Sequence, residues 1–157
     1  MSTIQSHHFT AALLTLLDET FDSVHGYFLD RNTSLFTTLA VISAEEASIP
    51  VGGKCATLAA QVKHTAFYLE VARNSLLDPN YPSADWGEIW RTVGHVTPQE
   101  WAAIQNGLRL NYNRILELIK ETPAWSNEDQ IASVIAIIAH TAYHLGEIRQ
   151  ALCTIKA

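Results

Sequence analysis

The chain has 157 residues, of which 48% are hydrophobic and 17% are charged, and its formal net charge is −6 with histidine neutral. This length suits a single domain spanning residues 1–157 that buries its own core without disulfides. The ten basic residues are scattered along the chain. Because binding to a phosphate backbone needs clustered Lys and Arg, the charge argues against a nucleic-acid partner.

Neither a targeting segment nor a membrane span is predicted. The N-terminal stretch lacks the basic and apolar regions of a signal peptide, and no uninterrupted apolar run of roughly 18 residues is present. We therefore expect a cytoplasmic protein without a membrane partner. Cys55 and Cys153 are too few for a disulfide framework and are expected to be reduced thiols.

The first half of the chain predicts three helices. The first spans residues 4–30, with an apolar stripe at helical spacing that runs from Phe9 to Phe28. Ser34 is a candidate N-cap for a shorter helix over residues 35–47, which Pro50 follows. The next helix spans residues 57–77 and places His64 near its middle, at the border of its buried face.

The second half predicts a long connection over residues 78–95 and two further helices. The connection contains a short helix over about residues 85–91. Thr97, Pro98 and Glu100 form a capping box with its proline, which starts a helix that ends before Pro123. Ser126 is the expected cap of the last helix, which runs through residue 155. Without a period-two strand pattern, the chain is predicted to be all-α, with four long helices in a bundle.

A histidine pair in the last helix, His140 and His144, is the strongest candidate for a functional site. Residues four apart lie one turn above each other on the same face of a helix, so both imidazoles can point at one ion. Thr141 occupies the position where a zinc protease of the HExxH type carries its glutamate, which excludes that class. Spacing alone leaves two alternatives, a metal site or hydrogen-bonded core histidines, and it does not include His64.

Two segments carry a resemblance to a known family. Residues 138–150, IAHTAYHLGEIRQ, resemble the last-helix signature of the DinB/YfiT-like family of four-helix-bundle metalloproteins, and residues 59–69, AAQVKHTAFYL, are similar to its histidine-bearing second helix. Residues 33–47 and 85–101 also resemble segments of proteins in this family. The resemblance implies an up-down-down-up bundle, often a homodimer, with a divalent metal bound by His64, His140 and His144.

Three neutral imidazoles would leave a divalent ion with its full charge and an open position. Zinc, nickel, iron and manganese all accept nitrogen ligands, so the ligand type does not fix the metal. Relatives in this family include thiol-dependent transferases, which implies S-transferase-like chemistry between a low-molecular-weight thiol and a small electrophile. The alternatives are a metal-dependent hydrolase and a non-catalytic, stress-related metal- or ligand-binding dimer. No residue is identified as a catalytic acid or base.

Several residues near these positions have two interpretations. Glu147, three residues after His144, either orients that imidazole or is a solvated helix-face carboxylate. Tyr68 and Tyr143 are expected to be core residues more often than groups near an ion. Of the tryptophans, only Trp86 and Trp90 are plausible walls of a pocket. The remaining histidines are not expected to be ligands: His7, His8, His25 and His95.

Overall fold

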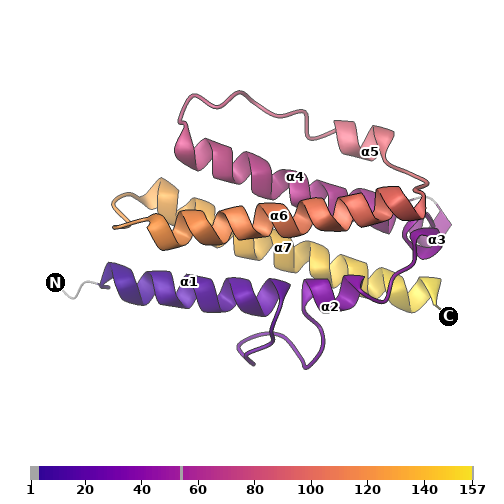
Figure 1. Cartoon of the computed structure of the whole chain (residues 1–157), viewed down its shortest axis with the longest axis horizontal. Helices are drawn as coiled ribbons and strands as arrows, with labels where there is room; N and C mark the ends of the chain where they lie inside the picture. Colours follow the sequence, from indigo (N-terminus) through magenta and orange to yellow (C-terminus); the bar gives the residue numbers. More distant parts are fainter. Residues whose placement is uncertain (1–3, 54, 157) are drawn as a thin grey trace.

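All regular elements of the computed structural model, which describes residues 4–53 and 55–156, are helices (Figure 1). They confirm the prediction of an all-α protein. The elements are α1 (Ser6–Phe21), α2 (Leu35–Leu39), α3 (Ala44–Ala47), the 3-10 turn η1 (Val51–Gly53), α4 (Leu58–Leu77), α5 (Glu88–Thr92), α6 (Pro98–Glu121) and α7 (Glu128–Ile155).

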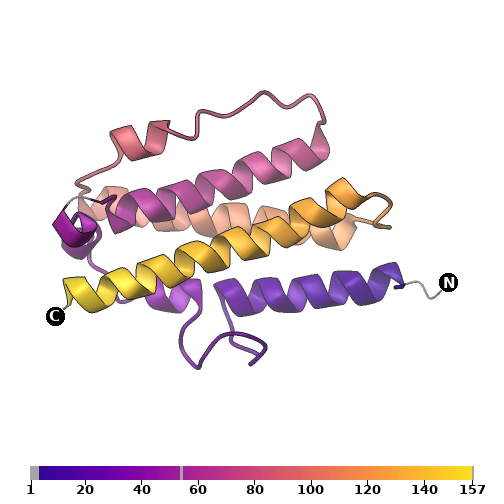
Figure 2. The same ribbon diagram turned by 180° about the vertical axis from the view of Figure 1, so that it is seen from behind.

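Four long helices, α1, α4, α6 and α7, lie side by side and enclose the core (Figures 1 and 2). Helix α4 contacts both α6 and α7, and α1 contacts the same two helices. Both views place the connection that carries α5 on the outer side of α4. Burying each large aliphatic side chain contributes about 1.5–3 kcal/mol. The most deeply buried large side chains include Leu17, Phe21, Leu58, Leu69, Leu108, Ile115, Ile137, Leu145 and Ile148.

Helix α1 ends at Phe21, so the prediction of a helix through residue 30 is wrong in its last third. The carboxylate of Glu19, which is fully buried, accepts hydrogen bonds from three backbone N–H groups that follow the helix. The chain therefore folds back over the helix end, with Gly26 at a φ of 84°. The donors are Tyr27 at 3.0 Å, Phe28 at 2.9 Å and Leu29 at 2.8 Å.

The predicted helix over residues 35–47 is two helices, α2 and α3, separated by four residues. A capping box starts α3: the Ser43 hydroxyl accepts from the Glu46 N–H at 3.1 Å, and the Glu46 carboxylate accepts from the Ser43 N–H at 2.8 Å. Because these side chains satisfy backbone groups at a new helix start, the chain does not continue α2 through this point.

The other helix starts follow their local signals closely. Thr57 caps α4, and Thr97 with Glu100 forms the predicted capping box of α6. Helix α7 differs by one residue, because the Asn127 side chain, rather than Ser126, accepts the N–H of Gln130 at 2.8 Å. The short helix α5 begins three residues later than predicted.

Helix α7 is long and apolar enough, by length and composition alone, to cross a membrane, although the sequence contains no uninterrupted apolar run of that length. The core helix of a soluble protein passes the same test. In this fold α7 contacts α4 and α1. Its buried side chains include Val134, Ile137, Leu145 and Ile148.

Candidate metal centre

The structure brings His64, from the middle of α4, together with His140 and His144 of α7. One ring nitrogen of each residue lies within 4.8 Å of the other two. His64 and His144 are only 7% and 5% exposed. The helical spacing of the pair and the packing of α4 against α7 therefore place three imidazoles around one point.

Polar atoms at this point lack hydrogen-bond partners. Over residues 4–53 and 55–156, four buried side-chain nitrogen or oxygen atoms have none: Gln61 Oε1, His64 Nδ1, His140 Nε2 and Thr141 Oγ1. All four belong to the two short stretches that carry the histidines. Leaving such an atom unpaired costs about 1–3 kcal/mol. The unpartnered ring nitrogens of His64 and His140 are therefore available to a metal ion.

The surroundings keep the three imidazoles neutral near pH 7. Burial, together with the neighbouring His144, lowers the pKa of His64 to about 4. Burial and the two other histidines lower the pKa of His140 to about 4 as well. Burial also lowers the pKa of His144, although Glu147 opposes this shift. Neutral imidazole is the form that donates a lone pair to a metal.

Glu147 contacts the site directly. One of its carboxylate oxygens lies 2.9 Å from Nδ1 of His144, one turn earlier on α7. Such a contact selects the tautomer that carries the proton on Nδ1 and leaves Nε2 free for a ligand. Of the two interpretations that the sequence allows, the structure therefore favours the one in which Glu147 orients this imidazole.

Aromatic rings surround the histidines. The ring centroid of Trp90 lies 4.6 Å from that of His64, and the centroid of Trp86 lies 6.0 Å from it, so both tryptophans are neighbours of this histidine. Tyr68 stacks on His140 with its ring centroid at 3.7 Å. Tyr143 is 62% exposed, so the expectation that it is a core residue is wrong.

An open cavity of about 550 Å³ lies beside the metal centre: none of the three histidines is among its lining residues, but Glu147, which contacts His144, is one of them. Its lining includes Gln61, one turn before His64, together with Tyr143 and Glu147, which flank His144. Cys55 also lines it, and both cysteines are exposed free thiols. Sequence reasoning missed Gln61 and Cys55 as site neighbours. The helical spacing of Gln61 from His64 is the signal that identifies the first, whereas only tertiary structure reveals the second.

The remaining histidines do not join the site, as predicted. His25 lies beyond the end of α1, where its Nε2 is 2.6 Å from an oxygen of Asp18. His95 is exposed in the segment before α6, and His7 and His8 are neighbours in the first turn of α1.

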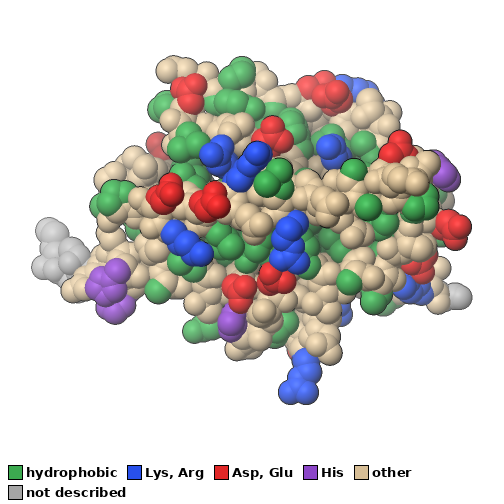
Figure 3. All heavy atoms as spheres, viewed as in Figure 1, with side chains coloured by type: hydrophobic (Ala, Val, Ile, Leu, Met, Phe, Trp, Pro, Cys, Tyr) green, Lys and Arg blue, Asp and Glu red, His purple; other side chains and the backbone are tan. Residues whose placement is uncertain are grey.

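Basic and acidic side chains are interspersed over the face shown in Figure 3, in agreement with the scatter seen in the sequence.

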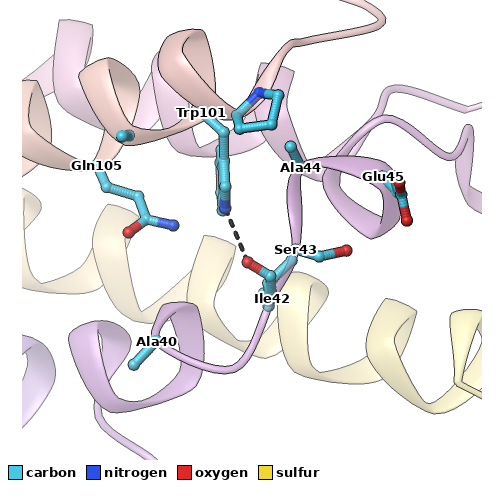
Figure 4. Close-up of a pocket in the computed structure, with 9 residues that line it drawn as sticks. Ala40, Ile42, Ser43, Ala44, Glu45, Trp101 and Gln105 are labelled. Carbon is cyan, nitrogen blue, oxygen red and sulfur yellow. Dashed lines mark hydrogen bonds between the residues drawn. The ribbon is translucent and has the colours of Figure 1, made fainter.

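A second open cavity, of about 450 Å³, lies between α6 and the segment that carries α2 and α3 (Figure 4). Trp101 reaches across it and donates a hydrogen bond from Nε1 to the carbonyl oxygen of Ile42 at 2.8 Å. Its lining includes Gln105 and Glu45 but none of the three site histidines. This hydrogen bond fastens the start of α6 to the α2–α3 segment.

The donor set suits a borderline divalent ion, since three imidazole nitrogens leave at least one coordination position open. Comparisons of the chain with protein family models, with curated proteins and with solved structures find no match. The function is therefore inferred from the geometry and chemistry of the three histidines and their neighbours.

Proposed function

We propose that this protein is a divalent-metal-dependent enzyme whose ligands are His64, His140 and His144, with S-transferase-like chemistry between a thiol and a small electrophile. The observation that carries the proposal is the convergence of three neutral imidazoles, two of them buried and the third, His140, partly buried; His64 and His140 each have a nitrogen atom without a hydrogen-bond partner. Zinc, nickel, iron and manganese remain equally compatible with this donor set.

We also propose that the fold is the up-down-down-up bundle of the DinB/YfiT-like class. The course of the chain supports this: α1 and α7 run in one direction in Figure 1, and α4 and α6 run in the other. The resemblance of residues 59–69 and 138–150 to that family adds the histidine positions. A homodimer in the cytoplasm, with no nucleic-acid or membrane partner, belongs to the same proposal.

The residues around the site suit thiol chemistry. A divalent ion supplies Lewis acidity, which favours the anionic form of a thiol in the adjoining cavity. Glu147 holds the His144 ring in one orientation, and Tyr68 packs flat against His140. Trp86 and Trp90 cover His64 and limit the access of water on that side. In the reaction the thiol releases its proton to solvent, the sulfur bonds to the electrophilic carbon, and the leaving group departs with the bonding electrons.

The first test is the metal content of untagged protein, purified without a metal column or chelator. We expect close to one divalent ion per chain in the wild type and in a control variant, His95→Ala, whose histidine is exposed and outside the site. His140→Ala is expected to lose the ion. A wild-type protein that takes up no zinc, nickel, iron or manganese after incubation would refute the metal centre.

The second test separates catalysis from other roles of the ion. Metal-loaded protein is incubated with 2-mercaptoethanol and an alkylating electrophile, and thiol consumption is followed beside His144→Ala. Loss of turnover in a folded variant supports the enzyme. If the wild type shows no turnover and His144→Ala only lowers the melting temperature, the site is structural, and a non-catalytic metal-binding protein is the better description. Turnover with an ester but not with the thiol would indicate a hydrolase.

A further inference from the structure

The cavity beside the histidines is mostly apolar, with a few polar side chains in its lining. Gln61 and Glu147 face it from opposite helices, α4 and α7, and each lies one helical turn from a site histidine. Gln150 and Thr154 extend the same face of α7 away from the site. A ligand whose reacting group lies at the histidines would therefore place its remaining atoms against these side chains.

Two side chains of this lining, Glu147 and Gln61, offer hydrogen-bond acceptors close to the site histidines. Glu147 supplies a carboxylate, and the amide oxygen of Gln61 is buried without a partner, so both favour a ligand that donates hydrogen bonds. Among the described residues that line the cavity, none is Lys or Arg. The formal net charge of −6 adds a general repulsion of anions.

We propose that this cavity binds the thiol substrate and selects one that carries an ammonium group, an aminothiol, over thiols that carry a carboxylate. The ammonium group lies near the Glu147 carboxylate and donates to the Gln61 amide oxygen, while the sulfur reaches the histidines. This inference rests on the proposed function, because it assumes that a thiol is bound at the metal centre. It adds the class of thiol and the residues that select it.

The test uses three two-carbon thiols that differ in charge: cysteamine, which is cationic, 2-mercaptoethanol, which is neutral, and mercaptoacetate, which is anionic. Each is titrated into the cobalt(II)-loaded protein at low ionic strength, and binding is followed by the sulfur-to-cobalt charge-transfer absorption. We expect affinity to fall in that order. Protein-bound cobalt is measured after the thiol is removed, so that stripping of the metal is recognised.

The three thiols also differ in their intrinsic affinity for cobalt. Variants of the cavity separate this difference from the contribution that the cavity makes to thiol affinity. Gln150→Lys places a cation in the lining and should lower the cysteamine-to-mercaptoacetate affinity ratio about tenfold relative to wild type. Glu147→Gln keeps an acceptor for His144 but removes the negative charge, and it should lower the ratio similarly. Gln130→Lys is the matched control: it makes the same change on α7, twenty residues from position 150, or about 30 Å along the helix.

The outcomes separate the two proposals. A ratio that falls in Gln150→Lys and Glu147→Gln but not in Gln130→Lys supports selection by this cavity. If all three thiols bind and the ratio is the same in every variant, the aminothiol inference is wrong while thiol binding at the metal stands. If cobalt binds but no thiol changes the spectrum, the thiol-dependent function fails and this inference fails with it.

Discussion

Two regions of the interior bury polar groups, and they satisfy them to different degrees. At the end of α1, Glu19 is fully buried, and its two oxygens accept hydrogen bonds from three backbone N–H groups. Between α4 and α7, one ring nitrogen of His64 and one of His140 are also buried, yet neither has a hydrogen-bond partner. In the first region the buried carboxylate is hydrogen-bonded within the fold. In the second region buried ring nitrogens are left free to bind a ligand.

This difference separates a structural role from a binding role better than burial does. The backbone hydrogen bonds of Glu19 more than offset the effect of burial, and its pKa lies below the ordinary value. Its carboxylate closes the loop after α1 and has no bonding capacity directed at a ligand. The histidines remain neutral, and ring nitrogens of His64 and His140 lack hydrogen-bond partners. This lowers the stability of the metal-free protein and favours the binding of a cation.

The largest effect on folding is expected at Glu19. Glu19→Ala leaves three N–H donors near the end of α1 without their acceptor and should lower the free energy of unfolding by roughly 3 kcal/mol. Urea unfolding measures this, with Glu117→Ala as the control because Glu117 is an exposed residue of α6. Metal content should not change. If Glu19→Ala also abolished metal binding in the folded state, the two regions would not be independent.

Much of the fold follows from local signals in the sequence, but its helix ends do not always do so. The capping box of Thr97 and Glu100 is a local motif, and it predicts the start of α6 correctly. The Ser43–Glu46 box has the same form and stands at the break between α2 and α3, but the apolar pattern around it led to the wrong prediction of one continuous helix. The end of α1 depends on Glu19 reaching residues up to ten positions ahead, which helical periodicity does not encode.

The candidate site, like the fold, is predicted from the sequence only in part. The spacing of His140 and His144 predicts that they share a helix face, while His64 enters only through the family resemblance, because one histidine in a helix has no spacing to interpret. The contact of Glu147 with His144 is a local relation within α7 and was among the alternatives considered. The cavity that Cys55 helps to line forms only when the segment after η1 packs beside α7, so tertiary contacts define it.

An intermediate effect is expected from pH. In the unfolded chain His64 and His140 take up protons near the ordinary pKa of 6.5, whereas in the fold their pKa values are about 4. Between these values the unfolded state binds more protons, so the free energy of unfolding of the metal-free protein should fall as pH decreases through this window. Urea unfolding across the window measures the fall.

The double variant His64→Ala/His140→Ala provides the control for this pH dependence. It lacks both titrating groups, so its stability should fall less over the same window, and the difference between the two proteins removes the contribution of carboxylates. Bound metal should oppose the fall in the wild type, because it binds the neutral imidazoles of the folded state. Equal pH dependence in both proteins would mean that the histidines are not buried in neutral form.

The smallest effect is expected at Glu147, the only hydrogen-bond partner of a site imidazole among the described residues. Glu147→Ala removes the group that orients His144 but none of the three proposed ligands, so metal affinity should fall about 10- to 100-fold rather than vanish. Glu147→Gln retains an acceptor at this position and should lose less. Competition with a chelator of known affinity measures both variants. If Glu147→Ala bound metal as tightly as the wild type, packing between α4 and α7 would be sufficient to orient the imidazoles. The metal centre would then need no hydrogen-bonding carboxylate, whereas the loop after α1 depends on Glu19.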